Sequence, residues 1–280
     1  MENILYHYCG VDGFFNIIKN ATIWLSDVSK SNDYQECILC RDRIDKCIEK
    51  VMEEDDQYLE AWKWGVAHRL GLNRELYTYC ACFSESCDQL SQWRGYANNG
   101  RGISIGFDKN LLFELADADP HRVAFAPVIY KKEEQERYIE VIVEDNLKIL
   151  EYKGIGHVAA ELNTNYRLKF PFVKHSSFWE EKEWRIVVSS RPGVQRLKMS
   201  ENYEFSAVNY RSTNEKLISY IEMNFKKIKK ELIKEIWIGP KSEVEIDDIV
   251  SFLDTCGYYE GVPYNSFEPI LIRKSESSYR

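Results

Sequence analysis

The sequence lacks any run of apolar residues that approaches the roughly 18 to 20 needed for a membrane-spanning helix. Residues 1–15 contain no cationic leader followed by a long apolar stretch, so no signal peptide is expected. An excess of positive charge is missing too, since 37 Lys and Arg against 45 Asp and Glu give a net charge of −8. We therefore expect a cytoplasmic protein with no membrane partner, and nucleic acid is a disfavoured partner.

Paired two-residue cysteine knuckles of the kind that hold zinc are also missing, although the chain has eight cysteines. Cys37, Cys40 and Cys47 have the spacing of the inner stripe of an amphipathic helix. Cys80 and Cys82 lie in a strand-like segment. Because free cysteine behaves as a small buried hydrophobe and cytosolic disulfides are rare, this pattern favours core positions over disulfides or metal ligands.

Aromatic residues are present in excess: 18 Tyr, 13 Phe and 7 Trp make 14% of the chain. This excess argues against disorder and indicates either an aromatic-lined pocket or a core rich in rings. Trp24, Trp184 and Trp237 fall on expected strands, so we assign them to the core. The aromatic residues that lie beside polar motifs, and so suit a pocket, are Tyr6, Tyr8, Trp93, Tyr96, Phe107 and Trp179.

Hydrophobic patterning predicts strands scattered among helices, without a repeat, a linker or regular alternation. Strands are expected at 3–8, 22–26, 77–83, 102–107, 183–189, 235–239 and 269–272. Helices are expected at 11–19, 35–70, 111–116, 131–169 and 217–233, with a last one that a capping box at Ser242 and Glu245 opens. We therefore predict an α+β protein of one domain, residues 1–280, with helical insertions at 35–70 and 131–169 that select the target.

Two segments are richer in polar and aromatic residues than a simple core requires. In the first, His7 ends the first expected strand, where a lone histidine is otherwise a surface or capped residue. The second segment, residues 82–107, contains Arg94 and Tyr96, then turn residues, then an expected strand. Ser104 lies on that strand and is small enough for a flat ligand to approach the backbone. The glycines of this segment do not form a dinucleotide fingerprint, and a hairpin without a ligand is the alternative reading.

A third segment, residues 178–185, places Glu181, Glu183 and Arg185 on one face of an expected strand. On a solvated face this pattern is simply an ion-paired strand. In a pocket it supplies two carboxylates, one of them held by a cation. Such a carboxylate can stabilise positive charge on a sugar as a glycosidic bond breaks, or accept a hydrogen bond from a ribose hydroxyl.

Several motifs together resemble a bacterial domain of unknown function, family 2971, over roughly residues 4 to 240. They are the segments 83–84, 92–96, 100–107, 179–185 and 236–240. More distantly, the succession of His7, residues 23–25, residues 100–107 and Glu181-x-Glu183 resembles the ADP-ribosyltransferase superfamily. That resemblance implies a central, mostly antiparallel split sheet, with NAD as the substrate. The cysteine spacing leaves no metal site expected.

The same resemblance implies a role for individual residues. His7 would bind ribose and Ser104 would line the nicotinamide pocket. Glu183 would be the catalytic carboxylate, and Glu181 would present the acceptor. The aromatic residue that stacks on nicotinamide would be Tyr8, Tyr96 or Phe107, and Arg94 is a further cofactor-binding candidate as a local cation.

The function expected from this resemblance is that of an NAD-dependent ADP-ribosyltransferase or NAD glycohydrolase, such as a toxin or defence effector. It would pass ADP-ribose to an unknown macromolecular acceptor or to water, and Glu183→Gln would remove turnover while leaving folding nearly intact. Two alternatives stay open. One is a nucleic-acid-binding or processing module that uses Trp93, Arg94, Tyr96 and Arg101. The other is an inactive interaction domain on the same fold.

Overall fold

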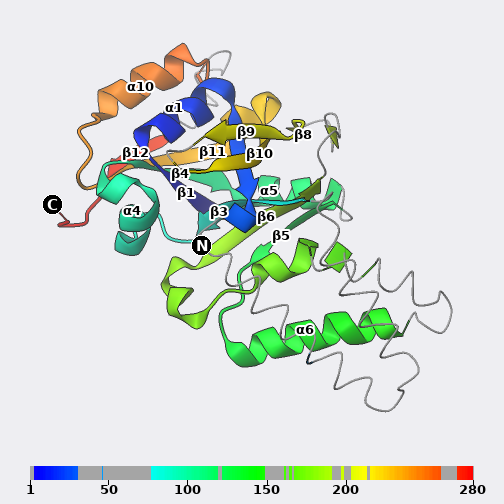
Figure 1. Cartoon of the computed structure of the whole chain (residues 1–280). Helices are drawn as coiled ribbons and strands as arrows, with labels where there is room; N and C mark the ends of the chain where they lie inside the picture. Colours follow the sequence, from blue (N-terminus) through cyan, green and yellow to red (C-terminus); the bar gives the residue numbers. More distant parts are fainter. Residues whose placement is uncertain are drawn as a thin grey trace.

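The computed structural model describes residues 3–30, 46, 77–118, 122–148, 161, 164–165, 167–190, 197–198, 203–212, 215–259 and 270–279. Within these ranges the strands form one open, mostly antiparallel sheet with helices beside it, which is the predicted α+β class (Figure 1). The insertion predicted at 35–70, with its three cysteines, lies outside the described residues apart from Lys46. The segment predicted to be helical at 131–169 contains helix α6 (Lys132–Leu147), and residues 149–160 lie outside the description.

The sheet runs in the order β12-β11-β4-β1-β3-β2-β10-β8-β7, with β6 on β3, β5 on β6 and β9 on β10. Only the β11–β12 pair is parallel among the described strands. The strands are β1 (Ile4–Cys9), β2 (Thr22–Asp27), β3 (Tyr77–Ser84), β4 (Ile103–Asp108), β5 (Val123–Pro127), β6 (Glu183–Ser190), β7 (Leu197–Lys198), β8 (Glu204–Phe205), β9 (Asn209–Ser212), β10 (Leu217–Asn224), β11 (Ile233–Ile238) and β12 (Leu271–Lys274).

Helices cover both faces of this sheet. Helices α1 and α10 lie together on one side, whereas α6 lies on the other (Figure 1). The α-helices besides α6 are α1 (Val11–Asn20), α4 (Leu90–Tyr96), α5 (Lys109–Ala118), α9 (Lys229–Leu232) and α10 (Ile246–Thr255). The 3-10 helices are η1 (Val28–Lys30), η2 (Asn98–Gly100), η3 (Phe170–Phe172), η4 (Ser176–Glu181) and η5 (Lys226–Ile228).

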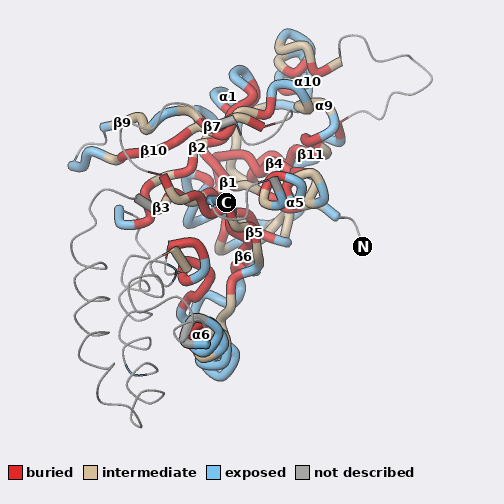
Figure 2. Tube along the Cα trace, turned by 90° about the vertical axis from the view of Figure 1, so that its right-hand side faces the viewer, coloured by how far each residue is buried: buried red, intermediate tan, exposed pale blue. Residues whose placement is uncertain are grey.

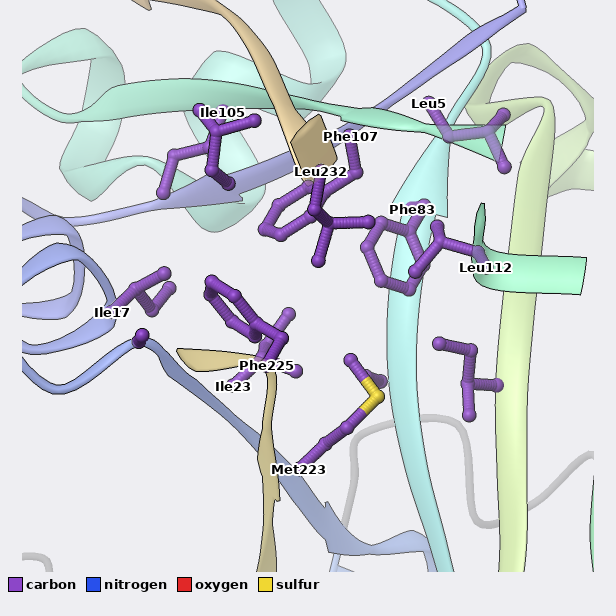
Figure 3. Packing of buried hydrophobic residues seen from close by; sticks show 14 of the residues in the cluster. Leu5, Ile17, Ile23, Phe83, Ile105, Phe107, Leu112, Met223, Phe225 and Leu232 are labelled. Carbon is purple, nitrogen blue, oxygen red and sulfur yellow. The ribbon is translucent and has the colours of Figure 1, made fainter. Parts of the chain in front are cut away.

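The main hydrophobic core lies between the sheet and helices α1, α5 and α10. The central strands are buried, whereas the outer face of α6 is exposed (Figure 2). Phe107 is fully buried in this core, edge-on to Phe83 and Phe225 at ring-centroid distances of 5.5 and 6.0 Å (Figure 3). A smaller cluster on the opposite face contains Trp93 of α4. Because successive strand residues point to opposite faces, neighbours in the sequence belong to different clusters.

Hydrophobic patterning located seven of the twelve described strands, whereas β5, β7, β8 and β9 were not predicted. The predictions at 3–8, 22–26, 77–83, 102–107, 183–189, 235–239 and 269–272 are confirmed to within two residues at each end as β1, β2, β3, β4, β6, β11 and β12. In β6, Trp184 and Ile186 enter the main core while Val187 faces the other way, as the alternation indicated. The helices predicted at 11–19 and 111–116 are α1 and α5.

The helix predicted at 217–233 is wrong. Residues 217–224 form strand β10, followed by the short helices η5 and α9. Ser219, Ile221 and Met223 are buried in alternation with less buried neighbours, and β10 pairs with β2 from Thr22 to Ser26. Apolar residues in this stretch fit both a helical and a strand period, and pairing with β2 decides between them.

The capping box of the last helix is also displaced from its predicted place. Helix α10 begins after Glu245, and this N-cap exchanges side-chain hydrogen bonds with Asp248 at the third helical position. The motif has the same spacing as the predicted pair Ser242 and Glu245 but lies three residues later. The acidic Glu245 therefore caps the amides at the positive end of the helix dipole.

Candidate functional site

A cavity of about 500 Å³ opens between β1, β2 and the beginning of α1. Its volume lies in the range of about 300 to 1,000 Å³ that is typical of small-molecule sites. The polar and aromatic residues in its wall include His7, Tyr8, Trp24, Ser26, Tyr96 and Arg211. Three of these, His7, Tyr8 and Tyr96, are predicted site residues, which the structure brings together from β1 and the end of α4.

The cavity forms because β1 and β2 pair with opposite ends of one edge of β3. Strand β1 pairs with it at Ser84, and β2 pairs with it at Tyr79 and Cys80. Within the described sheet, residues 81–83 have no strand partner on this edge, whereas β6 pairs with the other edge from 77 to 84. The two strands that diverge here are joined by α1, whose first turn becomes part of the cavity wall.

His7 occupies part of this opening. Its ring Nδ1 lies 2.9 Å from the carbonyl oxygen of Cys82, one of the residues on the unpaired edge. Burial lowers the pKa of His7 despite this hydrogen bond, so the ring is neutral at pH 7. Because a carbonyl oxygen only accepts, Nδ1 carries the proton and donates it, and Nε2 keeps its lone pair. His7 therefore offers a hydrogen-bond acceptor, which suits a hydroxyl or amine donor on a ligand.

Tyr8 is held rigidly in the same wall. Its hydroxyl donates to the carbonyl oxygen of Ser86 at 2.8 Å and accepts from the backbone N–H of Gln89 at 3.0 Å. Its ring meets Trp93 edge-on, with ring centroids 4.8 Å apart. Burial raises the pKa of Tyr8, so the phenol stays protonated at neutral pH. Tyr8 thus presents a fixed aromatic surface rather than an ionisable group.

Tyr96 connects the cavity to a buried group of charges. It ends α4 and is 47% exposed, and its hydroxyl donates to Glu181 Oε1 at 3.0 Å. The other oxygen of Glu181 accepts from the Nζ of Lys174 at 2.5 Å. Glu181 is the last residue of η4, so it precedes β6 rather than sharing the strand face as predicted. The Glu181 carboxylate consequently lies one hydrogen bond from the cavity wall.

Glu183 lies deeper in the same group of charges. It begins β6 and is 5% exposed. Arg185 Nε and Nη2 donate to its two oxygens at 2.7 and 2.8 Å, and Lys174 Nζ lies 3.1 Å from Oε2. Lys174 is itself 1% exposed and joins both glutamates. Both oxygens of Glu183 are therefore engaged by buried cations.

The two carboxylates titrate differently. Burial opposes the ionisation of Glu183, but the charge and hydrogen bonds of Arg185, with the charge of Lys174, outweigh it and lower its pKa to about 2. Burial raises the pKa of Glu181, although the hydrogen bonds from Lys174 and Tyr96 act in the opposite direction. Pairs of acids whose pKa values are pushed apart often divide acid–base and electrostatic roles. Glu183 therefore stays ionised to lower pH than Glu181 does.

Three predicted site residues lie away from the cavity. Phe107 faces the main core at 0% exposure, so the prediction that it could stack on nicotinamide is wrong, and Tyr8 and Tyr96 remain of the three candidates. Ser104 is also fully buried, opposite Tyr8 in the β1–β4 pair, and does not line the cavity. Arg94 is exposed on α4, with its guanidinium 6.0 Å from the ring centroid of Tyr279.

Three functional candidates escaped the sequence reasoning. Trp24, which we assigned to the core, is only partly buried and its ring lines the cavity. Arg211 reaches the same wall from β9, which no sequence pattern indicated. Lys174 follows a run of apolar residues at 170–173, and that flanking run was the only signal that the lysine is buried.

Three further features concern the described residues. No group of three or more His, Cys, Asp or Glu side chains within the described ranges could hold a metal ion. Cys80 and Cys82 lie with their Sγ atoms 3.7 Å apart on β3. Across the same described part of the chain, every helix is too short or too polar to cross a bilayer.

Comparison with known proteins finds one family model that matches part of the chain. The family model described as a protein of unknown function, DUF2971, matches residues 92–186. This match supports the resemblance to that family and spans Tyr96, Lys174 and both glutamates, but it ends short of His7 and Arg211 on either side. No curated protein and no solved structure shows significant similarity to the chain.

Proposed function

We propose that the chain cleaves the bond between nicotinamide and ribose in NAD and passes ADP-ribose to a macromolecular acceptor or to water. The observation that carries this proposal is the hydrogen bond between Tyr96, in the wall of a nucleotide-sized cavity, and Glu181. It links a proton-exchanging carboxylate to a cavity that has aromatic walls. The distant resemblance to ADP-ribosyltransferases supports the same reaction class.

The reaction requires negative charge beside a sugar carbon. When the bond between C1′ and the nicotinamide nitrogen breaks, its electron pair leaves with nicotinamide and positive charge develops on the ribose. A carboxylate that already points to this charge stabilises the transition state without reorganisation. The acceptor hydroxyl or water then forms the new bond to C1′ and gives its proton to a base, so that nicotinamide, ADP-ribosylated acceptor and one proton result.

The contacts favour Glu181 as the carboxylate that acts at the cavity. Glu183, to which the resemblance assigns the catalytic role, accepts three hydrogen bonds from the buried cations Arg185 and Lys174, whereas Glu181 accepts one from Tyr96 and one from Lys174. Glu181 shares Lys174 but lies next to the wall residue Tyr96. Its raised pKa suits a base that takes up the acceptor proton. In this proposal Glu183 is a positioning residue, because it fixes Lys174, which in turn holds Glu181.

The other wall residues suit the remaining parts of NAD. The unprotonated Nε2 of His7 can accept a ribose hydroxyl hydrogen, as the superfamily resemblance implies for this position. Tyr8 and Tyr96 offer rings for the nicotinamide, and an aromatic contact of this kind contributes on the order of 1 kcal/mol beyond its buried area. Trp24 adds a third ring at the other side of the opening.

Release of free nicotinamide from NAD tests this proposal. Purified protein is incubated with NAD labelled in both halves, with and without cell lysate, and free nicotinamide and labelled macromolecules are measured together. The wild-type chain should release nicotinamide, and Glu181→Gln should lower the rate by about 100-fold or more because a base is lost. The matched control is Glu180→Gln, which alters an exposed neighbour and should leave the rate unchanged.

Two results would contradict the proposal. One is a wild-type protein that releases no nicotinamide above background under any of these conditions. The other is a folded Glu181→Gln variant that retains the full rate, which would remove Glu181 from the reaction. Label that appears in water-soluble ADP-ribose rather than in macromolecules would identify water as the acceptor.

A further inference from the structure

A single permanent cation lines the cavity among the described wall residues. This is Arg211, the third residue of β9, which reaches β2 across the intervening strand β10. Its Nη2 donates to Ser26 Oγ at 3.0 Å, and its guanidinium carbon lies 5.4 Å from the centroid of the Trp24 ring. Both anchors come from β2 and hold the guanidinium plane in place at the opening.

The guanidinium of Arg211 is not fully used by the protein. Its Nε is buried, with an accessible area below 1 Å², and has no hydrogen-bond partner among the described residues. A buried donor without a partner is costly, so such groups in native proteins usually have a partner, a bound water or a ligand. Asp12 also lines the cavity, yet no ion pair joins it to Arg211 in the described part of the chain.

The positive charge and planar N–H donors of a guanidinium select a particular ligand chemistry. Nε–H and a neighbouring Nη–H form a planar fork that binds two oxygen atoms of one phosphate or carboxylate group. Helix α1 begins in the same wall at Gly10, an N-cap that makes no side-chain hydrogen bond to the first-turn amides. A Cβ added at Gly10 would meet no atom within 4 Å, so this side of the cavity has room for a ligand.

We propose that Arg211 is the residue through which the cavity recognises the phosphate of its ligand, so that the ligand is a phosphate-bearing nucleotide and not a nucleoside. This inference rests on the proposed function, in which the cavity binds NAD, and it adds the group that the cavity recognises. Arg211 lies outside the residues matched by the family model, which end at residue 186. The proposed ligand contact therefore lies on β9, a strand that the family match does not reach.

Equilibrium binding of ADP-ribose and adenosine tests the inference without any catalytic step. ADP-ribose carries two phosphates and adenosine carries none, and neither has a nicotinamide bond to cleave. The wild-type chain should bind ADP-ribose more tightly than adenosine. Arg211→Gln should weaken ADP-ribose binding on the order of 10- to 100-fold, the effect of losing charge-assisted hydrogen bonds, and leave adenosine binding unchanged. Arg101→Gln, which removes an exposed arginine outside the cavity wall, should change neither.

A second variant covers the case in which Arg211→Gln fails to fold because the contact with Trp24 is lost. Arg211→Lys keeps the charge and most of the stem but loses the planar fork, so it should bind ADP-ribose several-fold more weakly than the wild type. Circular dichroism and a thermal melt establish folding for each variant. Wild-type affinity for ADP-ribose in a folded Arg211→Gln or Arg211→Lys variant would overturn the inference, as would an equal loss for both ligands.

The two proposals fail in distinguishable ways. If ADP-ribose binding depends on Arg211 but NAD is never cleaved, the cavity is a nucleotide site and the proposed enzyme activity is wrong. If NAD is cleaved and Arg211→Gln leaves its KM unchanged, the enzyme stands and the phosphate contact is wrong. A wild-type chain that binds neither ADP-ribose nor adenosine overturns the inference outright.

Discussion

Replacing Glu183 by Gln removes the negative charge from the centre of a buried ionic group. In the wild-type chain its two oxygens accept three hydrogen bonds, two from Arg185 and one from Lys174. Both cations are nine-tenths or more buried, at 4% and 1% exposure. An amide has one oxygen and no charge. The variant therefore keeps at most part of these hydrogen bonds and loses one of the two carboxylates that neutralise the buried charges of Lys174 and Arg185.

The size of the effect follows from two independent arguments. Removing one partner of a buried ion pair typically costs about 3 to 5 kcal/mol, because an uncompensated charge remains. A pKa of about 2 for Glu183, against an ordinary value of 4.5, corresponds to ~3 kcal/mol of stabilisation of its ionised form. We therefore expect Glu183→Gln to lower the free energy of unfolding by about 3 kcal/mol. This is a large part of the roughly 5 to 15 kcal/mol typical of a domain.

The pH dependence of stability carries the same information. Because folding lowers the pKa of Glu183, its contribution is complete above the unfolded value near 4.5 and is lost as pH falls toward about 2. The difference in unfolding free energy between wild type and Glu183→Gln should therefore be about 3 kcal/mol at pH 7 and should shrink steadily below pH 4.5. Other carboxylates titrate in both proteins, so this difference isolates Glu183.

Urea denaturation followed by tryptophan fluorescence, at pH 7 and at steps down to pH 3, measures these quantities. Glu180→Gln provides the control and should stay within about 0.5 kcal/mol of the wild type, since Glu180 is exposed. If Glu183→Gln unfolds at the same urea concentration as the wild type at pH 7, the buried charge group does not stabilise the fold and the reasoning fails. The expectation from the sequence, that Glu183→Gln leaves folding nearly intact, would then hold.

Two further predictions concern the site and its support. Tyr96→Phe removes a donor that stabilises ionised Glu181, so the pKa of Glu181 should rise. The acid limb of the pH–rate profile for nicotinamide release should then move to higher pH. An acid limb that does not move would exclude Glu181 as the base. Gly102→Ala would place a Cβ 2.1 Å from the Cys9 carbonyl oxygen and should cost at least ~1 to 3 kcal/mol by urea denaturation, whereas Gly95→Ala, in open space within α4, should be neutral or slightly stabilising. Equal unfolding midpoints for these two glycine variants would contradict the packing around Gly102.

Alternation along the chain was sufficient to find three strands, β1, β2 and β3, on whose pairing the cavity depends. Strands β1, β2 and β3 follow from residues 3–8, 22–26 and 77–83, because one face of each is apolar. Alternation does not show which ends of strands pair, however. The cavity arises from the register of β1 and β2 on β3, and that register depends on contacts far apart in the sequence.

Residue type gave a partial account of the candidate site. His7, Tyr8 and Tyr96 were found because polar and aromatic residues gather near strand and helix ends. Phe107 was misassigned because an aromatic residue beside a glycine-rich motif fits a core as well as a pocket. Its side chain lies on the face of β4 that packs into the main core. Lys174 could not be anticipated, since a lone lysine is almost never buried unless charges from other segments surround it.

Arg211 illustrates the limit of local patterns most clearly. Its strand β9 has four residues, too few for a period to show, and its anchors Trp24 and Ser26 lie almost 190 residues earlier in the sequence. Only the order β3-β2-β10, with β9 beside β10, brings this arginine to the cavity. A residue whose role depends on the order of strands carries no signature in its own neighbourhood.

A structure of the Glu181→Gln variant soaked with NAD tests the central claim most directly, because slow turnover leaves the dinucleotide intact. The account predicts NAD in the cavity between β1 and β2, with the nicotinamide ribose beside residue 181, a ribose hydroxyl within hydrogen-bonding distance of His7, and a phosphate on Arg211. NAD bound elsewhere on the protein, or a cavity that stays empty at saturating NAD, would contradict it.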